Sequence, residues 1–170
     1  LLICNHVSLM DALIIGGSIR RPVRFVMDHR IFGTPVLRFI FRTARAIPIA
    51  PRHEDEALLN RAYERIDAEL ADGEVVCIFP EGKLTSDGEL SAFRPGIERV
   101  LARRLVPVVP MALRGLWGSF FSREHGAAMR RWPRRFWSRI ELVVGPPIAP
   151  AAASASTLQP VVAALRGDWR

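Results

Sequence analysis

The sequence predicts an α/β fold: a single-domain αβ sandwich in which helices flank a mostly parallel or mixed sheet. Short apolar segments alternate with segments of helical periodicity along the 170 residues, and several of the apolar segments have no polar face. Strands of that kind are typical of a sheet that is covered on both sides. The expected strands are 1–4, 22–28, 46–49, 74–79, 106–111 and 139–144, and the expected helices are 9–18, 35–42, 54–70, 95–104 and 158–166.

The expected elements rest on local patterns. The longest helix is predicted by apolar residues that share one helical face: Leu58, Leu59, Ala62, Tyr63, Ile66 and Leu70. Ser8 is expected to cap the first helix, and Thr34 the second, where Pro35 takes the first helical position.

Residues 1–148 are expected to form the domain, followed by an Ala/Ser-rich linker and a terminal helix within 149–170. The chain opens at Leu1 inside an apolar run, which we interpret as an N-terminally truncated fragment of a longer chain. No stretch reaches the ~18 continuous apolar residues of a membrane span.

Charge and cysteine content narrow the class of protein. Lys and Arg exceed Asp and Glu to give a net charge of +7, which favours an anionic partner: nucleic acid, an anionic membrane or a phosphate-bearing substrate. Cys4 and Cys77 are too few and too far apart for a disulfide scaffold, which favours a reducing compartment.

His6 and Asp11 form the first candidate pair. On one helix, five residues rotate by about 140°, so the two side chains meet only if His6 precedes the helix and Asp11 lies in its first turn. A carboxylate on one imidazole nitrogen leaves the other nitrogen free as a base. Alternatively, Asp11 merely complements the helix N-terminus. Cys4 is a candidate nucleophile or, more simply, a core residue.

Glu81, Gly82 and Lys83 follow the strand expected at 74–79. Ligands of open α/β sheets bind beyond the carboxyl ends of strands, and a glycine lets the backbone approach a ligand closely. Glu81 and Lys83 then offer an acidic and a basic group to a substrate. The alternative is a surface turn with solvated charges.

These motifs together resemble the glycerol-phosphate and lysophospholipid acyltransferases. Asn5-His6-x4-Asp11, Phe79-Pro80-Glu81-Gly82 and the apolar strand Val106-Pro107-Val108-Val109-Pro110 occur in that family's order. The resemblance implies an αβ sandwich with His6 as general base and Asp11 as its orienting partner. It also implies that Glu81 and Gly82 help to bind the acyl acceptor.

Two positions depart from the family pattern. Many members continue Glu-Gly-Thr-Arg, with the Arg taken to bind phosphate, whereas Lys83 and Leu84 stand here. Arg52 corresponds to the Arg of another block but stands among prolines. Residues 79–85 are most similar to the acylglycerophosphoethanolamine acyltransferase branch, in which the domain is often fused to a transporter or an acyl-carrier-protein ligase.

The resemblance implies transfer of a fatty acyl group from acyl-CoA or acyl-carrier protein to the hydroxyl of a lysophospholipid or acylglycerol phosphate, in phospholipid synthesis or remodelling. No cofactor and no metal are expected. Backbone N–H groups near Gly82 are the candidate oxyanion donors. The domain is expected to lie peripherally on the cytoplasmic side of the inner membrane, joined to further domains, with no nucleic-acid partner.

The segment 114–139 combines seven arginines with six aromatic residues. This mixture suits a lipid–water interface, and single-stranded nucleic acid or a solvated face are the alternatives. Two other functions remain open. One is a hydrolase that uses His6, Asp11 and Glu81, and the other is a non-catalytic basic module that depends on Arg134 and Arg135.

Overall fold

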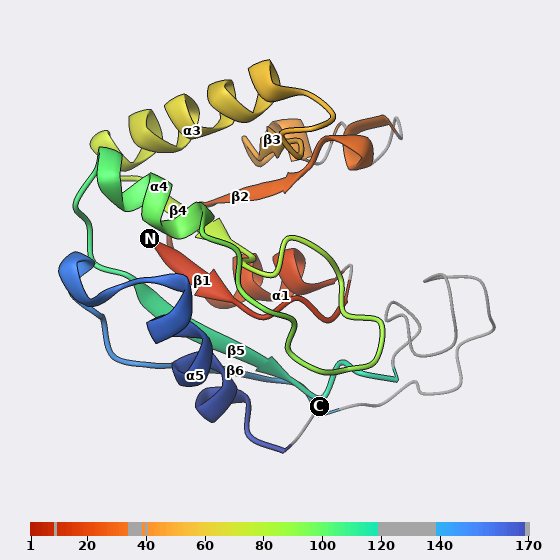
Figure 1. The fold of residues 1–170 in the computed structure, drawn as a ribbon. Coiled ribbons are helices and arrows are strands. Elements are labelled where there is room, and N and C mark those ends of the chain that lie inside the picture. The colour runs from red at the N-terminus through yellow and green to blue at the C-terminus, as the bar shows by residue number, and fades with distance from the viewer. Residues whose placement is uncertain (9, 34–38, 40, 119–138, 169–170) are drawn as a thin grey trace.

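The protein forms one six-stranded sheet with helices on both faces (Figure 1). The structure is a computed structural model that describes residues 1–8, 10–33, 39, 41–118 and 139–168. The strands are β1 Leu2–Cys4, β2 Val23–Asp28, β3 Ile47–Ile49, β4 Val75–Ile78, β5 Val109–Arg114 and β6 Glu141–Val144. The helices are α1 Asp11–Ser18, α3 Glu56–Ala71, α4 Gly96–Arg103 and α5 Ala155–Arg166, with 3-10 turns η1 His29–Gly33 and η2 Pro150–Ala152.

The strand order is β3-β2-β4-β1-β5-β6. Every neighbouring pair is parallel except β5 and β6, which are antiparallel. Because β1 lies between β4 and β5, the carboxyl ends of these three strands meet at one edge of the sheet. The predicted αβ sandwich with a mixed sheet is confirmed.

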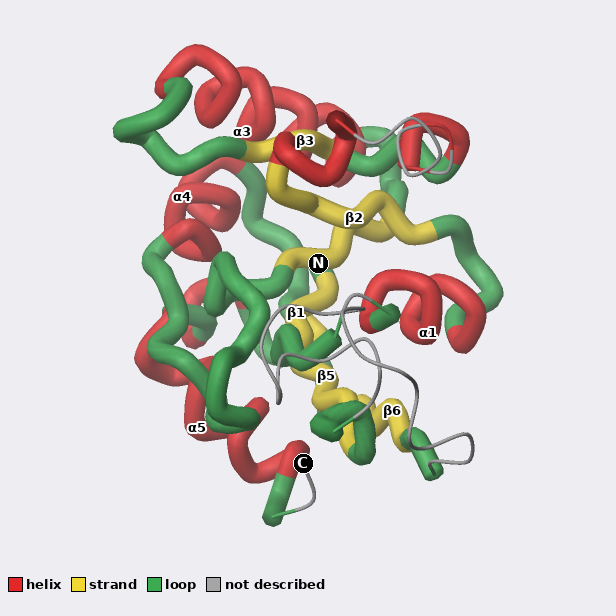
Figure 2. Tube along the Cα trace, turned by 90° about the vertical axis from the view of Figure 1, so that its right-hand side faces the viewer, coloured by secondary structure: helices red, strands yellow, loops and turns green. Residues whose placement is uncertain are grey.

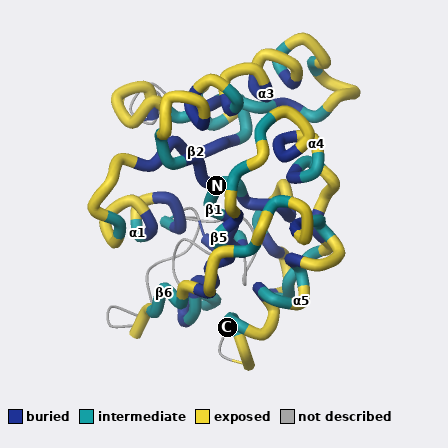
Figure 3. Tube along the Cα trace, turned by 90° about the vertical axis from the view of Figure 1, so that its left-hand side faces the viewer, coloured by how far each residue is buried: buried dark blue, intermediate teal, exposed yellow. Residues whose placement is uncertain are grey.

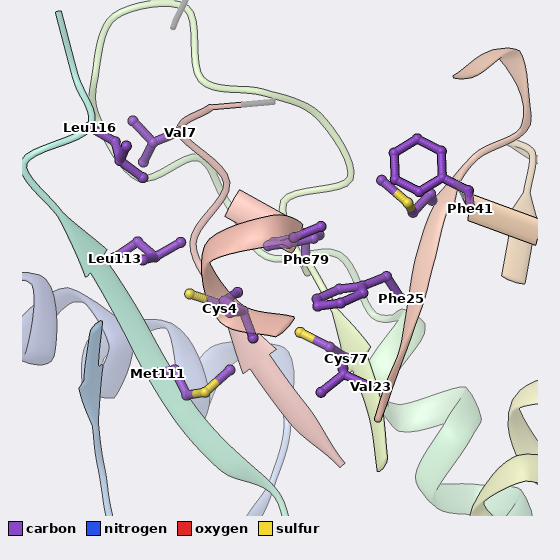
Figure 4. Close-up of a cluster of buried hydrophobic side chains, with 13 residues drawn as sticks. Cys4, Val7, Val23, Phe25, Phe41, Cys77, Phe79, Met111, Leu113 and Leu116 are labelled. Carbon is purple, nitrogen blue, oxygen red and sulfur yellow. The ribbon is translucent and has the colours of Figure 1, made fainter. Parts of the chain in front are cut away.

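The two faces of the sheet have separate cores. Ala12 and Ile15 of α1 pack on the face that carries Cys4 and Cys77, whose central residues are drawn in Figure 4. Helices α3, α4 and α5 cover the opposite face. Figure 3 shows exposed and buried residues alternating along α3, as expected of an amphipathic helix.

Strand β5 begins later than the expected 106–111. Val108 makes only an isolated bridge to Ile148, and the regular strand continues through Leu113 to Arg114. The buried Asn5 supports this continuation, because its side chain accepts from Leu113 N at 2.8 Å and donates to Leu113 O at 3.0 Å. The Asn5 amide thereby pairs with β5 much as a strand backbone would.

The C-terminal segment is part of the same fold. Residues 149–156 form η2 and the first residues of α5 in place of the expected linker. Ser154 caps α5 by accepting from Thr157 N, and Leu158 and Val162 are fully buried. The predicted terminal helix is present, and its apolar face explains why the Ala/Ser-rich residues before it are ordered.

Two further sequence expectations concern the second helix and membranes. The helix expected at 35–42 falls mostly outside the described residues. No described helix is long and apolar enough to cross a membrane.

Replacement of Leu158 by Ala tests whether α5 is integral to the fold. Truncating this buried side chain should lower the free energy of unfolding by about 2–5 kcal/mol. The matched control is Leu105→Ala, because Leu105 is 78% exposed and its truncation should change stability by less than about 0.5 kcal/mol. Equal effects of the two changes in chemical denaturation would show that α5 is not packed as described.

Candidate active site

The candidate site lies at the carboxyl edge of two neighbouring strands. His6 follows β1, and Glu81 follows β4, which pairs with β1 in parallel. Figure 2 shows the ends of β1 and β5 close to α1, which carries Asp11 at its first turn. Sheet topology therefore gathers residues from two distant sequence motifs at the edge where ligands of open α/β sheets bind.

The His6 and Asp11 side chains are in direct contact. Nδ1 of His6 lies 2.8 Å from Oδ2 of Asp11, whose side chain is fully buried, whereas that of His6 is 20% exposed. Contact with the carboxylate makes Nδ1 the protonated nitrogen of the neutral ring. Nε2 is then the nitrogen with a lone pair, so the pair has the arrangement of a general base.

The turn before α1 produces this contact. Asp11 also accepts from Val7 N at 2.7 Å and from Ser8 N at 3.0 Å, both through Oδ2. Ser8 was expected to cap a helix starting at residue 9, but α1 starts at Asp11 and Ser8 Oγ accepts from Met10 N. The Asp11 carboxylate thus satisfies two backbone N–H groups of the turn that precedes α1.

Phe79 lies against the imidazole. Its ring is stacked on the His6 ring with centroids 4.3 Å apart and an interplanar angle of 18°. Phe25 supports Phe79 from within the core, as Figure 4 shows. The stacked ring limits rotation of His6, and an aromatic face also stabilises a positive charge that develops on the imidazole.

The Glu81 side chain is buried, and its carboxylate accepts hydrogen bonds from backbone N–H groups instead of facing solvent. Its side chain accepts from His6 N through Oε1 and from Ser91 N through Oε2, both at 2.7 Å, and Glu81 is 2% exposed. Burial raises the pKa of the Glu81 carboxyl, and the two backbone hydrogen bonds offset part of this. In this conformation both carboxylate oxygens are engaged inside the protein.

Gly82 adopts a positive φ of 66° beside Arg94. A Cβ on Gly82 would lie 2.9 Å from Arg94 Nε, so the guanidinium rests directly on the glycine backbone. Lys83 and Arg94 are both exposed, which places two cations around Gly82 next to the candidate base. The N–H of Gly82 donates to Phe79 O and is therefore not an available oxyanion donor here.

Cys4 does not have the environment of a nucleophile. The side chain is fully buried, and its Sγ donates to Asn5 Oδ1 at 3.3 Å. Burial raises the pKa of the Cys4 thiol well above its ordinary value, which keeps it protonated and unreactive. The structure therefore supports the interpretation of Cys4 as a core residue.

Arg52 is not brought to His6. It follows β3, which is separated from β1 by β2 and β4, and three strand spacings amount to about 14 Å. Its exposed side chain pairs with Glu56 at 2.6 Å. The segment 119–138, including Arg134 and Arg135, lies outside the described residues.

Sequence reasoning missed Phe79 and Arg94 as members of the site. Phe79 was noted as part of the Phe79-Pro80-Glu81-Gly82 motif but not as a neighbour of His6, since stacking on His6 depends on the sheet order. Arg94 left a weak signal, because a cation immediately before the N-terminus of α4 is electrostatically unfavourable unless an anion compensates it. Within the described residues, no group of three or more His, Cys, Asp and Glu is arranged to hold a metal ion.

The chain is similar to known acyltransferases. The family model described as Acyltransferase matches residues 1–114. The chain is 30% identical over 116 residues to a chloroplastic 1-acyl-sn-glycerol-3-phosphate acyltransferase, BAT2, of Brassica napus, and 30% identical to LPAT1 of Arabidopsis thaliana. Each match covers 66% of this chain, which spans about a third of the length of these curated relatives (32% and 31%).

A solved structure shares the fold. The crystal structure of the 1-acyl-sn-glycerophosphate acyltransferase PlsC from Thermotoga maritima superposes with a TM-score of 0.69 at 20% identity. The match covers 99% of this chain and 67% of the other. It therefore includes α5, which lies beyond the region matched by the family model.

Replacement of Glu81 by Gln should reveal the burial of its carboxyl through pH. The pKa of the Glu81 carboxyl is raised in the folded protein, so folding favours its protonated form. The stability of wild type relative to the variant is therefore greatest below pH 4.5, the usual pKa of the group. This advantage is lost as the pH rises through the raised pKa of the folded protein. Denaturant unfolding of both proteins across this pH range gives the difference between their free energies of unfolding. The other titrating groups are the same in both proteins, so their contributions cancel in this difference. A difference that does not change with pH would contradict the buried placement of Glu81.

Proposed function

The chain belongs to the acyltransferase family, and on that premise we propose that it transfers a fatty acyl group from an acyl thioester to the free hydroxyl of a lysophospholipid or acylglycerol phosphate. This reaction would serve phospholipid synthesis or remodelling. The observation that carries the proposal is the 2.8 Å contact between His6 Nδ1 and the buried Asp11 carboxylate.

In the proposed mechanism, Nε2 of His6 removes the proton of the acceptor hydroxyl while its oxygen attacks the thioester carbonyl carbon. The tetrahedral intermediate collapses, the C–S bond breaks, and the imidazolium returns the proton to the leaving thiolate sulfur. The substrate supplies the hydroxyl, so no covalent acyl-enzyme is needed.

Two groups would stabilise the imidazolium that forms during attack. Asp11 provides a full negative charge in a buried site, where electrostatic interactions are stronger than in water. Phe79 presents its ring face to the same imidazole. Both act on His6 before a substrate arrives, so little reorganisation is required during the reaction.

The acceptor phosphate would bind near Gly82. Lys83 follows that glycine in the chain and Arg94 packs against it. Both are exposed, and their positive charges suit a phosphate monoester or diester. Glu81 would act indirectly, since it holds the backbone of His6 and Ser91 instead of touching the acceptor.

The donor and the setting of the reaction are also proposals. Acyl-CoA and acyl-carrier protein are both anionic, and either suits a chain of net charge +7. We place the domain peripherally on the cytoplasmic side of the inner membrane, where its acceptor lies, and expect further domains in the full-length chain.

Replacement of His6 by Ala tests the mechanism. Removing a general base should lower kcat by about 10²–10⁴-fold, measured as transfer from a labelled acyl thioester to a panel of lysophospholipids. The control is His53→Ala, because the His53 side chain is 81% exposed on another part of the molecule and should be dispensable.

The outcome also identifies the acceptor, since the lysophospholipid panel is run with wild type. Transfer that survives His6→Ala at the wild-type rate would contradict the assignment of the base. Equal losses in His6→Ala and His53→Ala would show that the assay reports general damage to the protein.

A further inference from the structure

The loop that joins β4 to α4 (the β4–α4 loop, residues 79–95) clamps the backbone of His6. The N–H of His6 donates to Glu81, and the carbonyl of His6 accepts from Thr85 N at 3.0 Å. Ser91 N donates to the second oxygen of Glu81. Both main-chain groups of the candidate base are therefore set by this loop, so a shift of the loop moves the imidazole.

Helix α5 holds the other side of the same loop. Arg166 donates through Nη1 to Gly88 O at 2.8 Å and through Nη2 to Glu89 at 3.0 Å. Gln159 accepts from Phe93 N at 3.0 Å. Residues at both ends of α5 thus reach back to a loop that lies far away in the sequence.

Thr85 connects the two sides of the loop. Its N–H bonds to His6, while its hydroxyl donates to Glu89 O at 2.7 Å and accepts from Gly88 N at 3.1 Å. Gly88 and Glu89 are the two residues that Arg166 contacts. The Arg166 guanidinium is therefore linked to the His6 carbonyl through Thr85 and either Gly88 or Glu89.

The end of α5 that carries Arg166 is itself held to the sheet. Arg114 at the end of β5 donates through Nε to Leu165 O at 2.8 Å and so fixes the last turn of α5. The Arg166 side chain is only 14% exposed, and its Nε is buried with no hydrogen-bond partner in the described part of the chain. A buried N–H without a partner is destabilising, so the remaining contacts of Arg166 must compensate.

We propose that Arg166 is a positioning residue for acyl transfer, which keeps the β4–α4 loop closed on His6 from a helix outside the region matched by the family model. This inference rests on the proposed function for its catalytic consequence. The closure of the loop itself does not depend on that function, so the two can be tested separately.

The test compares Arg166→Met, Arg166→Lys and the control Arg103→Met. Met keeps the apolar stem and removes the charge. Lys keeps the charge and a donor for Gly88 O or Glu89, but loses the two-nitrogen geometry that reaches both, together with the unpartnered Nε. Arg103 is the last residue of α4, as Arg166 is of α5, but it is exposed. All three are measured for amide hydrogen exchange and for kcat at matched folded fractions.

We expect Arg166→Met to speed exchange at Thr85 and Ser91 by about tenfold or more, with α3 unchanged, because the loop would open locally. Misplacing the base should lower kcat by about 10- to 100-fold with little change in donor KM. Arg166→Lys should recover part of both effects, and Arg103→Met should show neither.

Unchanged loop exchange in Arg166→Met would overturn the inference, as would faster exchange with wild-type kcat. Faster exchange in α3 as well would mean that Arg166 supports the whole fold, which also overturns a positioning role. If wild type transfers no acyl group, the proposed function fails, and the exchange data still decide whether Arg166 closes the loop.

Discussion

The buried carboxylate of Asp11 is the interaction on which the site depends. A charge with no exposure to water is stable only if donors surround it, and three N–H groups do so here: those of Val7, Ser8 and the His6 ring. The same three contacts shape the turn between β1 and α1. The group that orients the imidazole therefore also builds the backbone that carries it, so orientation and local fold cannot vary independently.

Glu81 repeats this arrangement from the neighbouring strand. Asp11 holds the ring of His6 and Glu81 holds its backbone, so the candidate base sits between two buried carboxylates contributed by different motifs. Each carboxylate is satisfied by N–H groups of turns, which explains why the residues around them have irregular backbone. Parallel pairing of β1 with β4 is what brings the two motifs within reach of each other.

Much of this could be predicted from the sequence, and the remainder depends on tertiary contacts. The spacing of His6 and Asp11 and the apolar strand before Glu81 were sufficient to predict the pair and the sheet edge. The role of Glu81 was not accessible, because its partners His6 N and Ser91 N are backbone atoms that leave no sequence signal. The extent of β5 depends on Asn5, and the ordering of residues 149–156 depends on burial of Leu158, both long-range contacts.

The most direct test of the account is the tautomer of His6, read from ring nitrogen chemical shifts in protein labelled with ¹⁵N-histidine. The account predicts that the neutral imidazole carries its proton on Nδ1, facing Asp11, and that this preference is lost in Asp11→Asn. Shifts showing the proton on Nε2 in wild type would contradict the central claim, because the nitrogen assigned as the base would then have no lone pair to accept the substrate proton.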